Sequence, residues 1–272
     1  MNQNNNSKSF IDKPREFINL LSRVEQIIGT INILITIGLF ISMMCIKVNG
    51  KPGYQMWQTY MVLFSNIANT ISVLLALHKR YTTYIWGMIA CVFLGAIAYS
   101  NALFGTMITY WVLCIISQTF LLFKWRKVAN GKAAITPKEM NWNHFIWYLF
   151  IFFALGLSFS FIESIPAFAN WWSRTKPEDI HQGIILFDSL GLFFLLATIY
   201  LLWNCYTQVW YCYFFADIAW LVMWSFNIYY HHADIVSLIS SISTMLALIT
   251  MVSLNICGMK NWKAENNKVE LL

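Results

Sequence analysis

Long apolar runs separated by short polar segments dominate the chain. About 20 residues cross the roughly 30 Å hydrocarbon layer of a bilayer as a helix. Runs of that length number eight and lie at about 26–46, 57–77, 84–102, 104–123, 144–164, 183–203, 209–229 and 235–257. The pattern predicts an all-α polytopic membrane protein with eight transmembrane helices.

The boundary between the third and fourth runs is the least marked. Only Ser100, Asn101 and Gly105 interrupt an apolar stretch of about 40 residues between 84 and 123. That length is too great for one span and fits two spans joined by a tight hairpin.

The basic residues orient these spans. Fourteen of the 18 Lys and Arg residues fall in the N-terminal tail, the C-terminal tail and the loops after the second and fourth spans, and four fall on the other side. Because cytoplasmic loops are rich in Lys and Arg, both termini are expected in the cytoplasm. The segment 10–25 is compatible with a helix lying along the inner interface and equally with a disordered tail.

Two parts of the chain share one layout. Spans two to four and spans six to eight are offset by about 126 residues, which suggests a parallel repeat of 3+1+3 helices after one extra N-terminal helix. The expected divisions are a tail at 1–25, the extra helix and outer loop at 26–56, bundles at 57–123 and 183–257, a linking segment at 124–182 and a tail at 258–272. A chance grouping of apolar segments remains the alternative.

Composition agrees with a lipid environment. Hydrophobic residues make up 58% of the chain, charged residues 11%, and the mean hydropathy is +0.56. A soluble globule is excluded because its surface needs about 25% charged residues. The net charge of +6 forms no dense basic stripe, so nucleic acid is not an expected partner. The polar first 25 residues do not resemble a secretory signal.

The sequence predicts no cofactor and no metal. The six cysteines lie in or beside apolar runs without a C-x-x-C pair, and they are expected to be small core residues. The outer loops carry a set of acidic and histidine residues, which are Glu178, Asp179, His181, His231, His232 and Asp234. We expect them to be solvated loop residues, and a zinc site is the weaker alternative.

Asp217 is the most informative polar residue. It lies about 12 Å inside the seventh span, near the midplane, where a charge is costly and needs a reason. Aromatic residues share its helical face, and the stripe is Trp210, Tyr213, Asp217, Trp220 and Trp224. Such a face suits a planar aromatic ligand with hydroxyl groups. The alternative is a packing seam ending in interfacial tryptophans.

Other polar or small positions in the spans have mixed roles. A hydrogen bond to a neighbouring helix is favoured over ligand contact for Asp188, and Glu163 lies near the outer end of the fifth span. Some further polar residues are expected to line a path and others to join helices: Asn66, Asn69, Thr70, Tyr110, Ser117, Gln118, Ser240, Ser241, Thr244 and Asn255. A small-residue ridge in the third span is expected to serve helix packing: Gly87, Cys91, Gly95 and Ala98.

From Asp188 onward the chain resembles the PnuC family of bacterial nicotinamide riboside transporters. Asp188-Ser189, Trp210 and positions 213 and 217 fall on that family's D-S … W-x-x-W-x-x-x-N pattern. The stretch 250–262 is similar to its closing T-x-x-x-L-N … W, and 103–125 to its early hairpin and the span that ends in tryptophan. The likeness covers about 57–262. Tyr213, Asp217 and Tyr110 depart from the family's Trp, Asn and Gln.

The resemblance implies a SWEET-like pair of three-helix bundles in a bacterial cytoplasmic membrane, a homo-oligomer such as a trimer, and facilitated diffusion with the cargo trapped by phosphorylation. The cargo is expected to be nicotinamide riboside or a related nucleoside, with a deoxynucleoside or thiamine as alternatives. The expected substrate-binding residues are Asn66, Asn69, Tyr110, Asp188, Trp210, Tyr213, Asp217, Trp220 and Asn255. A membrane-embedded enzyme is the rival class, but no nucleophile, metalloprotease or P-loop motif is present.

Overall fold

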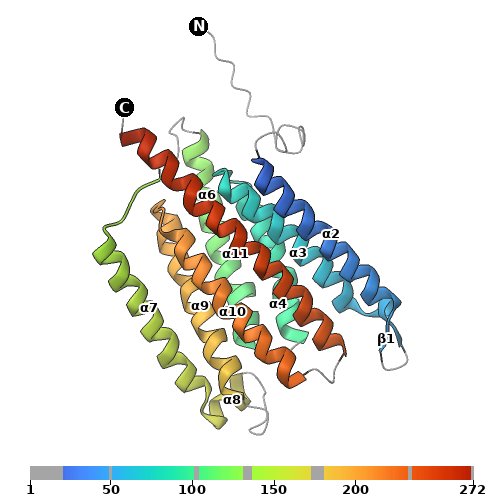
Figure 1. Cartoon of the computed structure of the whole chain (residues 1–272). Helices are drawn as coiled ribbons and strands as arrows, with labels where there is room; N and C mark the ends of the chain where they lie inside the picture. The colour runs from blue at the N-terminus through green and yellow to red at the C-terminus, as the bar shows by residue number, and fades with distance from the viewer. Residues whose placement is uncertain are drawn as a thin grey trace.

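A computed structural model describes residues 21–48, 51–100, 104–130, 137–172, 181–231 and 235–270. Its helices run side by side in an elongated bundle, and α2 begins at the same end where α11 finishes (Figure 1). Eight helices in the described residues are long and apolar enough to cross a membrane, as the sequence predicted. The predictions for residues 1–20 and for the outer loop at 173–180 fall outside the described residues.

The helical elements follow the apolar runs closely. They are α2 (Arg23–Cys45), α3 (Trp57–Leu77), α4 (Thr83–Ser100), α5 (Phe104–Ile108), the π-helical η3 (Thr109–Cys114), α6 (Ile115–Asn130), α7 (Trp142–Glu163), α8 (Pro166–Trp172), α9 (Gln182–Trp203), α10 (Val209–His231) and α11 (Ile235–Glu270). After α2 the chain forms a small hairpin of β1 (Lys47–Val48) and β2 (Lys51–Pro52), followed by the 3₁₀ turn η2 (Gly53–Gln55).

Two helices continue past their predicted ends. The fourth span was expected to stop at 123, but α6 runs to Asn130, and α11 runs to Glu270 instead of stopping at 257. The tail expected at 258–272 is therefore helical over its described part. Hydropathy marks where a helix leaves the hydrocarbon, whereas intrahelical hydrogen bonds let the helix continue into the polar region.

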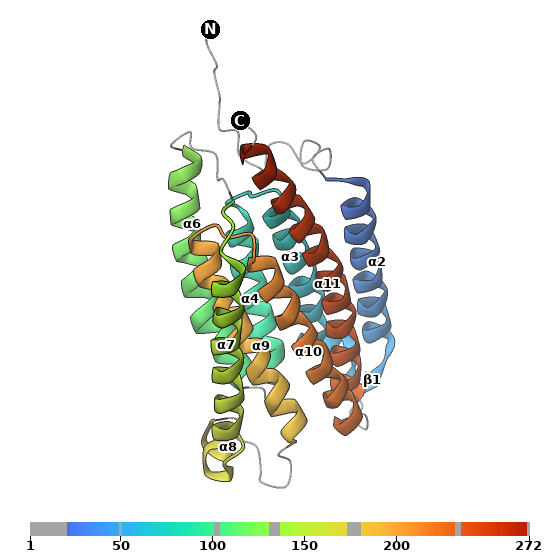
Figure 2. The same ribbon diagram turned by 60° about the vertical axis from the view of Figure 1, so that its left-hand side comes forward.

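Six helices form a ring. In the first triplet α4 packs against α3 and against the α5–η3–α6 segment, and in the second triplet α10 packs against both α9 and α11. The triplets then meet twice, because α3 contacts α11, and α5 and α6 contact α9. Helix α2 packs outside the ring on α3 and α11, and α7 packs on α9 (Figures 1 and 2).

Buried polar side chains fasten the extra helix α2 to this ring. Asn32 donates a hydrogen bond of 2.5 Å to the Thr70 hydroxyl of α3. Near the start of α2, Glu25 is only 1% exposed and accepts hydrogen bonds from His78 Nε2 at 3.0 Å and from Asn261 Nδ2 at 2.8 Å. Glu25 also caps its own helix through the Ser22 backbone N–H. One carboxylate thus joins α2, the end of α3 and α11.

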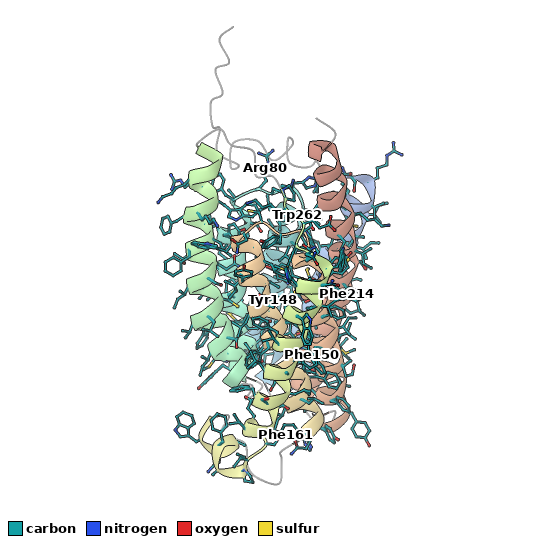
Figure 3. The ribbon with its side chains drawn as sticks, turned by 90° about the vertical axis from the view of Figure 1, so that its left-hand side faces the viewer. Arg80, Tyr148, Phe150, Phe161, Phe214 and Trp262 are labelled. Atoms are coloured by element: carbon teal, nitrogen blue, oxygen red, sulfur yellow. The ribbon has the colours of Figure 1, made fainter. Side chains whose placement is uncertain are left out.

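The buried core divides into two apolar clusters. One lies toward the end of the bundle that carries Lys79, Arg80, Lys124 and Lys260, which we call the basic end, and it contains Trp125, Trp210 and Trp262 among its largest members. Figure 3 places Trp262 near Arg80 and Phe161 at the opposite end. The other cluster, toward that opposite end, includes Val62, Ile97, Trp220, Met223 and Trp224.

Candidate functional site

The ring surrounds a cavity of about 160 Å³, and all six of its helices contribute to the wall. Eight of the nine predicted site residues line it: Asn66, Asn69, Tyr110, Trp210, Tyr213, Asp217, Trp220 and Asn255. They come from α3, η3, α10 and α11, which are far apart in the chain. The ninth residue, Asp188, is not part of the wall.

Asp217 is the charged group of this cavity. Its carboxylate is buried, and Oδ2 accepts a hydrogen bond of 2.7 Å from Asn255 Nδ2 of α11. The hydroxyl groups of Tyr110 and Tyr213 both lie within electrostatic range of this carboxylate. Among the described residues, no Lys, Arg or His lines the cavity. The described wall therefore holds an acidic side chain and no basic one.

The predicted aromatic stripe faces the cavity along its length. Trp210, Tyr213, Asp217, Trp220 and Trp224 all belong to the wall. Two of the indoles are also packed tightly against glycines. A Cβ added to Gly258 would lie 2.3 Å from the Trp210 ring, and one added to Gly191 would lie 2.4 Å from the Trp220 ring. The stripe residues therefore line the cavity, and two of them also pack closely against neighbouring helices.

Five buried polar atoms lack a hydrogen-bond partner among the described residues, and all five belong to residues of the cavity wall. They are the indole N–H groups of Trp125, Trp210, Trp220 and Trp262 and the side-chain oxygen of Gln118. The Trp220 N–H interacts with the Asp188 carboxyl but does not reach hydrogen-bond geometry. Because buried polar groups normally have partners, these atoms are open to hydrogen bonds from water or another polar molecule in the cavity.

A π-helical turn arranges the fourth span around the cavity. Thr106, Tyr110, Cys114 and Gln118 are four residues apart and all line the wall. In an α-helix, four residues overshoot one turn by roughly 40°, so three such steps would carry the last side chain away from the cavity. The wider turn of η3, at Thr109–Cys114, offsets this drift. The sequence pattern did not reveal this distortion.

Asp188 has an interhelical partner. The Thr106 hydroxyl of α5 donates a hydrogen bond to the Asp188 carboxylate of α9. Beside it, Ser189 donates a hydrogen bond of 2.7 Å to Glu163 of α7. These bonds join α9 to two neighbours, which is the role that the sequence favoured for Asp188. Since Thr106 lines the cavity, Asp188 lies one residue behind the wall.

The remaining polar positions divide between the two expected roles. Asn66 lines the cavity and donates a hydrogen bond of 3.1 Å to Ser243 of α11, whereas Thr70 faces Asn32 of α2. Ser241 accepts a hydrogen bond of 2.8 Å from Asn227. The small-residue ridge of α4 packs closely against its neighbour, as expected: a Cβ added to Gly95 would lie 2.2 Å from the Trp111 indole, and one added to Gly87 would lie 3.0 Å from Gln118. The sequence did not predict that three ridge residues also line the cavity, which are Gly87, Cys91 and Ala98.

Aromatic side chains cluster in the part of the cavity wall toward the basic end. Trp262 lies between Trp125 and Trp210, with ring centroids 6.2 Å and 5.6 Å away, and Tyr84 contacts Trp125 at 5.5 Å. All four line the cavity. In the sequence, Trp125 and Trp262 were noted only as the last residues of two stretches that resemble the PnuC family, and Tyr84 was not singled out. Aromatic residues at span ends are commonly interfacial anchors, so hydropathy could not separate them from that class.

Two groups in the turns of the basic end have shifted pKa values. The Lys79 ammonium lies over the Trp262 ring, 5.7 Å from its centroid, and burial lowers the pKa of Lys79 to about 8. Burial raises the pKa of the Cys205 thiol even though Lys79, Lys124 and Lys138 lie near it. The Lys79 amine, which lies beside Trp262, therefore titrates close to neutral pH.

The described residues contain no group of three His, Cys, Asp or Glu side chains suited to a metal ion. The alternative zinc site of the outer loops cannot be placed, because Glu178, Asp179, His232 and Asp234 lie outside the described residues.

Comparison with known proteins gives two matches. The family profile described as "Nicotinamide mononucleotide transporter" matches residues 59–264, a region that runs from the start of α3 into the last part of α11 and leaves out α2. A crystal structure described as that of the Vitamin B3 transporter PnuC is similar in fold, with a TM-score of 0.62 and 12% sequence identity over 91% of this chain and 94% of that chain. Among curated protein sequences, none matches this chain.

Proposed function

The chain belongs to the nicotinamide mononucleotide transporter family and is a membrane transporter rather than an enzyme, and we propose from this premise that it carries nicotinamide riboside or a closely related nucleoside-like compound. The observation that carries the proposal is the composition of the cavity. Its wall combines aromatic rings, the Asp217 carboxylate and four indole N–H groups that make no hydrogen bond within the described residues. A planar base bearing hydroxyl groups has complementary chemistry.

The charge of the wall favours the riboside over the phosphorylated mononucleotide. A phosphate brought into this cavity would lose its hydration and meet Asp217 without any Lys, Arg or His from the wall to balance it. The pyridinium ring of nicotinamide riboside is a cation, and a carboxylate nearby would lower the cost of burying it. Asp217 therefore supports a cationic or neutral cargo.

Individual roles follow from position in the cavity. Trp210, Tyr213 and Trp220 offer ring faces for stacking, and Tyr110 lies 5.9 Å from Trp220 between ring centroids. Asp217 accepts hydrogen bonds from ribose hydroxyls or from an amide, while Asn255 holds its carboxylate. Asn66 and Asn69 of α3 supply polar contacts on the facing wall.

The arrangement of the ring supports alternating access by facilitated diffusion. The middle helix of each triplet contacts both of its neighbours, and the triplets meet through the first helix of one and the last of the other. That symmetry fits the parallel repeat of SWEET-like carriers. The two apolar clusters lie on either side of Asp217 and serve as the inner and outer gates. We place the protein in a bacterial cytoplasmic membrane as a homo-oligomer with both termini in the cytoplasm.

Counterflow in proteoliposomes tests the cargo. Vesicles preloaded with unlabelled nicotinamide riboside should take up the labelled riboside, and nicotinamide mononucleotide should neither exchange nor compete. Thiamine and a deoxynucleoside are included as alternative cargoes of the same fold. If either one exchanges and the riboside does not, that compound is the cargo in place of nicotinamide riboside, and the protein is still a transporter.

A further inference from the structure

Gln118 of α6 places an amide in the cavity wall. Its side-chain carbonyl oxygen is buried and accepts no hydrogen bond within the described residues. The amide lies against Gly87 of α4, because a Cβ added to that glycine would lie 3.0 Å from the Gln118 amide carbon and oxygen and 3.2 Å from the nitrogen. Gly87 therefore leaves the space that the Gln118 amide occupies.

The two triplets carry matching aromatic contacts at the basic end. Trp125 of α6 meets Tyr84, the second residue of α4, edge-on with ring centroids 5.5 Å apart. Trp262 of α11 meets Trp210, the second residue of α10, edge-on with ring centroids 5.6 Å apart. These two contacts give positions in one triplet that can be compared with positions in the other.

Two amides occupy corresponding positions relative to these contacts. Gln118 and Asn255 each lie seven residues, about two helical turns, before the tryptophan of their own helix. Asn255 donates its hydrogen bond to Asp217, which lies seven residues after the aromatic residue that begins α10. The corresponding residue of α4 is Cys91, so the first triplet has a thiol where the second has a carboxylate. The Gln118 carbonyl oxygen is thus left open to a molecule in the cavity.

Gln118 and Asp217 belong to opposite walls. The helices follow one another around the ring in the order α3, α4, α6, α9, α10 and α11. The interface of α4 with α6, which holds Gln118, is therefore opposite the interface of α10 with α11, which holds Asp217. A cargo that reaches both walls needs polar groups at both ends. Nicotinamide riboside has a carboxamide on its base and hydroxyl groups on its ribose.

We propose that Gln118 recognises the carboxamide of the cargo, while Asp217 receives the ribose hydroxyls. An amide paired with an amide donates one hydrogen bond and accepts another, so the pairing gives the open carbonyl oxygen its donor. A carboxylate in place of the carboxamide offers this oxygen no donor, and an unsubstituted ring offers neither partner. Gln118 is thereby a specificity-determining residue for ribosides that bear a carboxamide. This inference rests on the proposed function.

Isothermal titration of two ligands against matched variants tests the assignment. The ligands are nicotinamide riboside and the ribosylpyridinium ion, which is the same riboside without its carboxamide. Gln118→Met keeps an unbranched side chain and removes the amide, so it should weaken binding of nicotinamide riboside about tenfold and leave ribosylpyridinium binding unchanged. Gln182→Met is the control and should leave both dissociation constants unchanged, because Gln182 does not line the cavity.

The unmutated protein provides a second measurement that needs no variant. Removal of the carboxamide from the ligand should weaken its binding by a similar factor, about tenfold. Equal affinities for the two ligands, or an equal loss for both in Gln118→Met, would overturn the role of Gln118 and leave nicotinamide riboside as the cargo. Failure of the unmutated protein to bind nicotinamide riboside would contradict the proposed function and this inference together.

Discussion

Asn255 of α11 donates a hydrogen bond of 2.7 Å to Asp217 of α10, so the buried carboxylate is held across a helix interface at the cavity wall. Asn255 reaches one carboxylate oxygen, and within the described residues the structure gives the other oxygen no hydrogen-bond donor. A carboxylate that is fixed but incompletely satisfied is suited to accept hydrogen bonds from a cargo.

The indole N–H of Trp220 provides a test that separates binding from packing. Trp220→Phe retains an aromatic ring but removes the indole N–H, which lies beside Gly191 and reaches hydrogen-bond geometry with no group in the described residues, although it interacts with the Asp188 carboxyl. If the cargo accepts this hydrogen bond, affinity should fall about 2- to 12-fold, which corresponds to about 0.5–1.5 kcal/mol. Isothermal titration with nicotinamide riboside measures it.

Trp111→Phe is the matched control. Trp111 also packs over a glycine, Gly95, but its N–H donates a hydrogen bond of 2.9 Å to the Val92 carbonyl, and Trp111 does not line the cavity. This variant should lose more stability than Trp220→Phe and keep its affinity. Equal affinities in the two variants would mean that the Trp220 N–H does not bind cargo.

The Glu25 junction predicts how strongly α2 is held. Glu25→Gln removes the charge and turns one accepting oxygen into a donor that opposes His78 or Asn261. The unfolding free energy should fall by about 1–3 kcal/mol, because hydrogen bonds to a buried carboxylate are lost. Titration with sodium dodecyl sulfate in mixed micelles measures the change. Glu139→Gln, at an exposed position, is the control and should have little effect on the unfolding free energy. An equal loss in both variants would mean that the hydrogen bonds of Glu25 do not stabilise the fold.

Lys79 predicts a pH-dependent stability. Its pKa is about 8 in the folded protein, below the ordinary value of 10.5, because the amine is buried. Between these two pH values the folded state binds fewer protons than the unfolded state, so stability should rise as pH increases above about 8 and should be insensitive to Lys79 below that. Thermal midpoints in detergent from pH 7 to 9.5 measure the rise.

Lys79→Gln should flatten this rise relative to the unmutated protein. Lys260→Gln, which removes an exposed charge at the same end of the bundle, should retain it. The same slope in the Lys79 variant would show that another group titrates.

Membrane orientation is a separate prediction. An even number of spans puts the start of α2 and the end of α11 at one end, and the Lys and Arg distribution predicts that this end is cytoplasmic. Green fluorescent protein fused after Leu272 should fluoresce, and a truncated fusion after Val48 should not, because this reporter folds poorly after export. The reversed pattern would invert the topology.

The sequence could predict the spans because each is a local property of about 20 residues. Asp217 and its aromatic neighbours were also predictable, since an α-helical period places them on one face. The partners across the cavity were harder to find. The contact of Asn255 with Asp217 and the packing of Trp262 near Trp125 both depend on helix packing between distant segments, and the π-helical turn has no marked sequence signal.

The central claim is that Asp217 recognises cargo in a carrier that only equilibrates it, and uptake of labelled nicotinamide riboside into proteoliposomes, with and without an imposed proton gradient, tests this most directly. The unmutated protein should bring the internal concentration to the external one and no higher in either condition. Asp217→Asn keeps the shape and one acceptor oxygen, so it should still equilibrate the riboside with altered affinity. Accumulation above the external concentration under the proton gradient, lost in Asp217→Asn, would contradict the claim and make the protein a proton symporter.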